Sequence, residues 1–522
     1  MSEHLTTRAF SALRWGYAGF AARALASFGS GVVLARLLGP KPFGQVAAAM
    51  LVFGLANQLA NAGFSSALVQ APKLDGKDVR FAFTFQVAIG AALTVCCALV
   101  APLVGIAMHD PVIGDVLRVT GLVFLIQAFG QTSASLLRRR LAFRPVQTAQ
   151  VLSSVAGYAV VGVVAASLGA GVWSLVAAQL AQSITFTALV YAQDRHSVVP
   201  CWSWSSLRLA RFGINVTGLN ILNWSISNFD YIFVGRAFGS TSLGLYSRAF
   251  NTVSAPEDAI VSTWQQVLLA GCSRLGDRFK FQRAYLASLS AVALITFPVF
   301  WSVSACAPVV VAGLYGARWT ETTPMLRPLA VALTLHAIMA MAGPILAAAD
   351  QVRREVRTQA LSLVVAIGVF YLCIAHSAVA IAWGVLGVYA FRFVVVTRQA
   401  LPVLEIRWRD VIRALRGPSI AGAITAGAVW AASRVLSSYL VKPGLMLAAL
   451  IATGAAAILI LLLVAADRIL SRELVLVLSQ LSKSFPTRLS LRLTEMNARQ
   501  ASRGTARQRH AYKGASFEVT AP

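Results

Sequence analysis

Several charged side chains of this chain lie inside long apolar stretches of its sequence. In residues 228–249, NFDYIFVGRAFGSTSLGLYSRA, they are Asp230, Arg236 and Arg248. Such groups are costly in hydrocarbon unless they face a partner or a water-filled cavity. Guanidinium groups around a cavity would suit a phosphate-bearing ligand, because their planar fork makes paired hydrogen bonds with phosphate oxygens.

The same spacing occurs about two hundred residues upstream, in LARLLGPKPFGQV. The shared pattern is Arg-x-x-Gly-x-x-x-x-Gly, and it aligns Arg36, Gly39 and Gly44 with Arg236, Gly239 and Gly244. Leu117-Arg118 likewise resembles Leu326-Arg327 at a similar offset. These coincidences predict an internal duplication.

Six arginines are candidate cations of a substrate-binding cavity: Arg23, Arg36, Arg118, Arg236, Arg248 and Arg327. Arg23 stands among alanines in the first apolar run, too deep to reach the headgroups easily, which favours a cavity. For Arg36, Arg118, Arg236 and Arg327, which lie near the ends of apolar runs, the alternative is a side chain that only extends to the headgroups.

The acidic residues in the apolar runs are Asp230, Glu257 and Asp258. Asp230 and Arg248 lie at similar depth on either side of a predicted turn, so a structural ion pair is the alternative to a role in transport. Glu257 and Asp258 follow Pro256. They either bind a coupling H⁺ or Na⁺, or lie hydrated at an unwound turn shaped by the proline.

The chain lacks the signatures of an enzyme. We find no DxD pair in a cytoplasmic loop, no GxSxG, HExxH or P-loop, and no CxxC metal site among six scattered cysteines. No catalytic residue, metal or organic cofactor is therefore expected. The net charge of +26 lies in short clusters between apolar runs, which is typical of membrane topology signals and not of a nucleic-acid-binding face.

The elements that carry these residues are predicted to be transmembrane helices. The chain is 57% hydrophobic and 12% charged, with a mean hydropathy of +0.71, which indicates an all-α integral membrane protein. A helix needs about 20 apolar residues to cross the bilayer core. Fourteen stretches qualify: 17–38, 45–68, 82–107, 116–137, 147–168, 171–192, 212–236, 242–268, 285–312, 325–348, 358–375, 378–397, 417–438 and 444–466.

Lysine and arginine are concentrated in the loops after the even-numbered spans, so both termini are predicted to be cytoplasmic. Segments that mix Trp and Arg precede spans 1, 7 and 13 and mark repeat boundaries. We expect two parallel six-helix repeats, 1–206 and 207–404, then spans 13 and 14 within 405–466. The basic tail, 467–522, is expected to be amphipathic at first and then disordered.

The motifs RLLGPKPFG and NFDYIFVGRAFG…LGLYSRAFN, with Pro256 shortly after, resemble those of the bacterial polysaccharide-transport family, the Wzx-type flippases of the multidrug/oligosaccharidyl-lipid/polysaccharide exporter superfamily. The resemblance covers about residues 10–465. It implies a V-shaped, two-lobed transporter in the bacterial inner membrane. Its substrate would be an undecaprenyl-diphosphate-linked oligosaccharide, moved to the periplasmic leaflet by alternating access.

By motif, the family's cationic cavity maps onto Arg36 and Arg236, and by position in the spans onto Arg23 and Arg248; its aspartate maps onto Asp230. Membrane lipids and the polysaccharide polymerase and export machinery are the implied partners. Two alternatives stay open: a flippase for the peptidoglycan precursor lipid II, and a non-transporting scaffold of a polysaccharide assembly complex.

Overall fold

Every secondary-structure element in the described part of the chain is a helix. The computed structural model describes residues 22–60, 68, 74–202, 208–272, 278–348, 352–438 and 442–470. Backbone groups find no water in a bilayer core, and a helix satisfies them within one segment. The prediction of an all-α chain is therefore confirmed for these residues.

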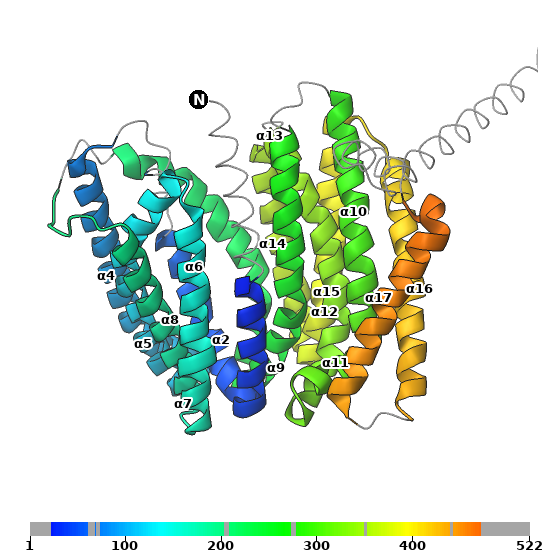
Figure 1. Cartoon of the computed structure of the whole chain (residues 1–522), viewed down its shortest axis with the longest axis horizontal. Coiled ribbons are helices and arrows are strands. Elements are labelled where there is room, and N and C mark those ends of the chain that lie inside the picture. The colour runs from blue at the N-terminus through cyan, green and yellow to red at the C-terminus, as the bar shows by residue number, and fades with distance from the viewer. Residues whose placement is uncertain are drawn as a thin grey trace, which may run out of the picture. The chain divides into compact units, whose positions relative to one another are not determined.

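Figure 1 shows the helices coloured in chain order. After a helix over residues 22–38 come α2 (Pro40–Ala60), α4 (Gly76–Ala107), α5 (Pro111–Arg139), α6 (Phe143–Ser154), the π-helix η1 (Val155–Gly162), α7 (Val163–Ser167), α8 (Val172–Gln193) and α9 (Arg208–Cys272). They are followed by α10 (Arg278–Ala305), α11 (Ala307–Leu314), the 3₁₀ helix η3 (Ala317–Thr322), α12 (Thr323–Met339), η4 (Ala340–Ala342), α13 (Gly343–Ala348), α14 (Val352–Ile374), α15 (Ala378–Leu404), α16 (Trp408–Leu436) and α17 (Pro443–Ile469).

Eleven helical segments among the described residues are long and apolar enough to cross a membrane. They coincide one to one with predicted spans 2 to 6 and 9 to 14. Predicted spans 1, 7 and 8 fall on helix 22–38 and on α9. The chain is a multi-pass membrane protein, and its total of fourteen spans stays a prediction.

The two copies of the glycine motif form the same turn. Gly39 separates helix 22–38 from α2 with φ 76°, and Gly239 breaks α9 with φ 77° and ψ 178°. A side chain with a Cβ is strained in this left-handed region, and glycine is not. The first glycine of each motif therefore ends one helix and allows the next to begin in a new direction.

The contacts between helices divide the chain into two compact units. The first unit consists of Met1–Ala255, Val311–Leu329 and Val356–Val388, and the second of Pro256–Val310, Ala330–Glu355 and Tyr389–Pro522. The lobe boundaries predicted at 206 and 404 stay a prediction. Most of the expected basic tail, from residue 471 on, lies outside the described residues.

Within the first unit, α4, α5 and α8 lie side by side (Figure 1). Small residues bring α4 and α5 into close contact: a Cβ at Gly114 would lie 2.7 Å from the carbonyl oxygen of Ala101. Membrane helices associate through such close packing, because lipid tails are as apolar as the helices themselves.

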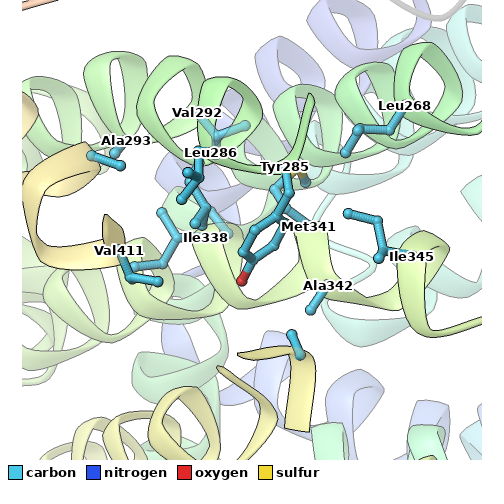
Figure 2. Packing of buried hydrophobic residues seen from close by; sticks show 14 of the residues in the cluster. Leu268, Tyr285, Leu286, Val292, Ala293, Ile338, Met341, Ala342, Ile345 and Val411 are labelled. Carbon is cyan, nitrogen blue, oxygen red and sulfur yellow. The ribbon is translucent and has the colours of Figure 1, made fainter. Parts of the chain in front are cut away.

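The second unit has a large apolar core. It joins the end of α9 with α10, with the segment from α12 to α13, and with the start of α16. Figure 2 shows Tyr285 and Leu286 of α10 beside Ile338 and Met341 in this core. Tyr285 is 1% exposed, and Ser290 on the same helix donates a 2.6 Å hydrogen bond to Ala414 O. The packing fixes α10 against α16.

Candidate functional site

The second glycines of the two motifs meet where two helices of the first unit cross. A Cβ at Gly44 would lie 2.8 Å from the backbone nitrogen of Gly244, and still nearer to the carbonyl oxygen of Ser240. Conversely, a Cβ at Gly244 would lie 3.0 Å from the nitrogen of Gly44 and 2.8 Å from the carbonyl carbon of Pro40. The start of α2 and the second arm of α9 therefore cross backbone to backbone, through equivalent positions of the two motifs.

Asp110 holds this crossing together from a third helix. Its Oδ1 accepts the backbone N–H of Val112 at the start of α5. Its Oδ2 accepts hydrogen bonds from Gln45 Nε2 at 2.9 Å and from Ser240 Oγ at 2.8 Å. One carboxylate thus caps its own helix and links both motifs.

The motif arginines cap helix ends in matching ways. Arg36 donates from Nε to Leu314 O at 2.7 Å and from Nη2 to Gly313 O, at the end of α11. Arg236 donates from Nη1 to Ala107 O at 2.8 Å, at the last residue of α4. The last carbonyls of a helix lack helical donors and carry partial negative charge, which both guanidiniums satisfy. Both side chains are exposed, and their predicted role in a substrate cavity stays a prediction.

Arg248 lies among aromatic rings in the same unit. Its guanidinium carbon is 4.1 Å from the centroid of Phe43, which Trp319 contacts edge-on at 5.6 Å. Tyr315 lies within electrostatic range of Arg248, and the Tyr315 hydroxyl lies 2.8 Å from Thr252 Oγ1. A half-buried cation over a ring face is stabilised without neutralising its charge.

Arg23 and Arg248 approach the same tyrosine. Tyr158, on the π-helix η1, lies within electrostatic range of both arginines. Arg23 is exposed and donates from Nη1 to Gln150 Oε1 at 3.5 Å. Of the six predicted arginines, these two therefore act electrostatically on one residue.

Asp230 has a different partner from the one predicted. Its Oδ2 accepts a short hydrogen bond from the hydroxyl of Tyr246 on the other arm of α9. Asp230 is 3% exposed, and no ion pair joins it to Arg248 in the part of the chain that the structure describes. The direct ion pair considered as one alternative is therefore not formed, and the neutral hydroxyl of Tyr246 is the partner of Asp230 instead.

The remaining predicted arginines lie at the surface of the first unit. Arg118 is exposed and forms a 2.9 Å ion pair with Asp115, three residues before it on α5. Arg327 is exposed near the start of α12. The role of both residues in binding stays a prediction.

The acidic pair after Pro256 belongs to the second unit. Glu257 is 1% exposed, and its Oε1 lies 2.9 Å from His336 Nδ1 on α12. The neighbouring Asp258 is exposed. Residues 251–260 are helical throughout, so the unwound turn considered at Pro256 is not formed. An acid and an imidazole in contact can share a proton, which is the chemistry that a coupling site needs.

Two residues near His336 were missed from the sequence. The His336 ring lies 5.2 Å from that of Tyr389, and the guanidinium of Arg392 lies 5.7 Å from the same Tyr389 ring. Arg392 is 5% exposed on α15. It stands inside the apolar run 378–397, so the criterion that selected Arg23 could have found it. Tyr158 and Phe43 carried no such signal, because only tertiary packing places them beside an arginine.

Solved structures share this fold at low sequence identity. A structure titled lipid II flippase MurJ, inward closed conformation, covers 86% of this chain and 97% of its own, with a TM-score of 0.69 at 14% identity. An inward-facing multidrug resistance MATE family transporter of the MOP superfamily covers 73% of this chain and 95% of its own, with a TM-score of 0.61 at 17% identity.

Curated relatives match part of the chain. The succinoglycan biosynthesis transport protein ExoT of Rhizobium meliloti (strain 1021) is 28% identical over 57% of this chain and 61% of its own length. The lipopolysaccharide biosynthesis protein WzxC of Escherichia coli (strain K12) is 23% identical over 61% of this chain and 66% of its own. The chain thus spans less than two thirds of either relative.

The family model described as "Polysaccharide biosynthesis protein" matches residues 33–324, which include both glycine motifs, Arg248 and Glu257. Since this match covers more than half of the chain and agrees with the resemblance of the motifs, the chain belongs to the polysaccharide biosynthesis protein family.

Proposed function

We propose that this protein is a transporter that moves an undecaprenyl-diphosphate-linked oligosaccharide across the bacterial inner membrane for exopolysaccharide, O-antigen or capsule synthesis. The family match and the names of the relatives, a succinoglycan transport protein and a lipopolysaccharide biosynthesis protein, support this class of substrate. The protein works by alternating access between the two leaflets and catalyses no covalent step. The polysaccharide polymerase and export machinery are its proposed partners.

We place the protein in the membrane with fourteen spans and both termini in the cytoplasm. The eleven apolar helices, helix 22–38 and the two arms of α9 support that number. The matching turns at Gly39 and Gly239 support two parallel repeats of six spans, followed by α16 and α17.

The environment of the Arg248 side chain is the main support for the proposed substrate. Its guanidinium is half-buried over Phe43, and no carboxylate among the described residues forms an ion pair with it. A cation held within an apolar helix array without a counter-ion is costly. An anionic ligand would offset this cost, and a diphosphate presents the oxygen pairs that a guanidinium binds best. Arg23, which also acts electrostatically on Tyr158, supplies a second cation.

We assign the coupling step to Glu257 and His336. Their 2.9 Å contact and the burial of Glu257 support a site that exchanges a proton during transport. We include the neighbouring Asp258 in this coupling site. A sodium ion is the alternative, because carboxylate oxygens also ligate hard cations.

Reconstitution in liposomes tests the proposed function. Purified protein should translocate a lipid-linked oligosaccharide, and Arg248→Gln should lose most of this activity, whereas Arg248→Lys should retain only part because ammonium lacks the planar fork. Arg434→Gln is the matched control, since Arg434 is an exposed arginine over Trp430 on α16. An Arg248→Gln variant with wild-type transport would refute the assignment.

Two competing functions give different outcomes in the same system. A lipid II flippase would translocate lipid II and leave the lipid-linked oligosaccharide in place. A scaffold would support polymer export in cells even when Arg23 and Arg248 are both replaced by alanine. Accumulation of cytoplasm-facing lipid-linked oligosaccharide in that double variant would exclude the scaffold.

A further inference from the structure

An apolar groove of about 480 Å³ lies between α5 and α8 in the first unit. Gly130 allows the two helices to approach closely here, because a Cβ at this residue would lie 3.0 Å from the Cα of Thr187. The Thr187 hydroxyl donates to Ile126 O at 3.1 Å, so it is already paired within the protein. The walls of the groove are apolar side chains and one tyrosine ring from neighbouring turns: Leu125 and Phe129 on α5, and Ile184, Ala188 and Tyr191 on α8.

The loop that follows α8 lies at one end of this groove. Val198 of the loop is a lining residue and is exposed. The loop is tied to α5 at its start, where Ser133 Oγ donates to Asp194 O at 2.8 Å and the Asp194 carboxylate pairs with Arg140 at 3.3 Å. The groove therefore has an apolar length and a polar rim that is fixed in place.

Guanidinium groups surround this rim. Arg80, near the start of α4, donates from Nε to Val199 O at 3.2 Å and from Nη2 to Pro200 O at 3.4 Å. A guanidinium has five N–H groups, so these two bonds leave donors for a ligand. Arg195 is exposed in the same loop. Since the single carboxylate of residues 194–202 already pairs with a third arginine, the rim carries a net positive charge.

The rim also lies beyond the groove along α4. Phe83 of α4 contacts the ring of Phe129 edge-on at 5.7 Å. Arg80 precedes Phe83 by three residues, which is about one helical turn. The positive charge is thus displaced from the apolar walls along the helix axis, as the headgroup of a lipid is displaced from its acyl chains.

The length of the groove fits one leaflet of a bilayer. From Ile184 to Tyr191 the axis of α8 rises by about 10 Å, and the acyl chains of one leaflet fill about 15 Å of the hydrocarbon core. An acyl chain can therefore lie along most of its depth in this groove, with its phosphate at the rim. An undecaprenyl chain is much longer than the groove and would leave most of its length outside.

We infer that this groove binds a phospholipid with an anionic headgroup, whose acyl chain lies between α5 and α8 and whose phosphate binds Arg80 and Arg195. A zwitterionic headgroup would bring a cation to the positive rim, whereas an anionic one brings only the phosphate charge. The loop lies on the side proposed to face the cytoplasm, where basic segments attract anionic lipids. This binding site is separate from the proposed substrate cavity and goes beyond the proposed transport.

Lipid binding to the purified full-length protein, measured by native mass spectrometry, tests the headgroup. The wild type should bind phosphatidylglycerol at least about fivefold more tightly than phosphatidylcholine with identical acyl chains, because each arginine near an anionic headgroup contributes about this factor. Arg195→Gln should weaken phosphatidylglycerol binding about fivefold and leave phosphatidylcholine binding unchanged. Arg434→Gln is the matched control, since it removes an exposed arginine from α16.

Filling the groove tests the acyl chain. Ala188→Trp should weaken binding of both lipids, whereas Ala98→Trp, at an exposed alanine of α4 outside the groove, should bind both as the wild type does. Phosphatidylglycerol should also raise the melting temperature of the wild type more than that of Ala188→Trp.

Three outcomes overturn the inference. They are equal binding of the two phospholipids by the wild type, wild-type phosphatidylglycerol binding in either Arg195→Gln or Ala188→Trp, and displacement of phosphatidylglycerol by an equal concentration of undecaprenyl monophosphate. The last result would assign the groove to a polyprenyl lipid instead.

Discussion

Replacing Gly244 by alanine tests whether the two motifs cross backbone to backbone. The new Cβ would lie 2.8 Å from the carbonyl carbon of Pro40 and 3.0 Å from the nitrogen of Gly44. Carbon atoms pack best at about 3.5–4.0 Å, and the carbonyl oxygen of Pro40 would lie nearer to the new Cβ than its carbonyl carbon does. The backbones must therefore separate by more than about 0.7 Å. No side chain can rotate away to relieve this contact, because the neighbouring atoms belong to the backbone.

The expected loss of stability follows from these distances. Forcing extra volume into a well-packed interface costs about 1–3 kcal/mol, and a rigid backbone obstacle places Gly244→Ala near the upper end. Alanine also favours the helix by up to about 1 kcal/mol relative to glycine, which offsets part of the loss. We expect a net destabilisation of about 2 kcal/mol.

Gly29→Ala is the matched control, since Gly29 is an exposed helical glycine with no atom within 4 Å of the added Cβ. It should gain the helix propensity alone and be stabilised by up to about 1 kcal/mol. Thermal unfolding of the purified proteins in one detergent gives the order of their melting temperatures. The close crossing would be refuted if the melting temperature of Gly244→Ala equalled or exceeded the melting temperatures of both the wild type and Gly29→Ala. The Gly44→Ala, Gly244→Ala double variant should lose less than the sum of the single variants, because both act on one contact.

Three further variants test other contacts. Trp319→Phe removes the 2.9 Å hydrogen bond to Ala35 O, so we expect a loss of about 1 kcal/mol in thermal unfolding; an unchanged melting temperature would contradict it. Burial lowers the pKa of His196, so the unfolded chain takes up the proton first and stability falls as the pH drops below about 6.5. His196→Asn should flatten that fall in melting curves recorded between about pH 7 and pH 5, and an equally steep fall would refute the assignment. His336→Ala leaves the buried Glu257 carboxylate without its imidazole partner and should destabilise the protein by about 3 kcal/mol in thermal unfolding. Adding Glu257→Gln should restore part of the lost stability. A double variant no more stable than His336→Ala would argue against the pair.

The membrane character of the chain could be predicted from the sequence because hydrocarbon imposes one local requirement. Each span needs about 20 apolar residues, and this property belongs to a continuous segment. The eleven apolar helices therefore coincide with predicted spans. The turns at Gly39 and Gly239 could also be predicted from local sequence, because a left-handed backbone favours glycine in any fold.

Which side chains meet depends on contacts between segments far apart in the chain. Arg36 and Arg236 share a motif and a spacing, and only the packed structure shows that both satisfy carbonyls at the ends of other helices. The sequence placed Asp230 opposite Arg248, but in the packed structure the hydroxyl of Tyr246 is the partner of Asp230. Spacing determines depth in the membrane and not the direction in which a side chain points.

The sequence by itself determined that this protein is built of apolar helices, that two Arg-Gly motifs repeat, and that charged residues lie within the membrane. Only the tertiary structure decided which other side chains surround each of those charged residues. It placed Arg248 over Phe43 beside Gly31, and it placed Tyr158 of the π-helix η1 within electrostatic range of Arg23 and Arg248. The physical reason is that hydrophobicity acts on each segment separately, whereas a binding site requires side chains of several helices to converge.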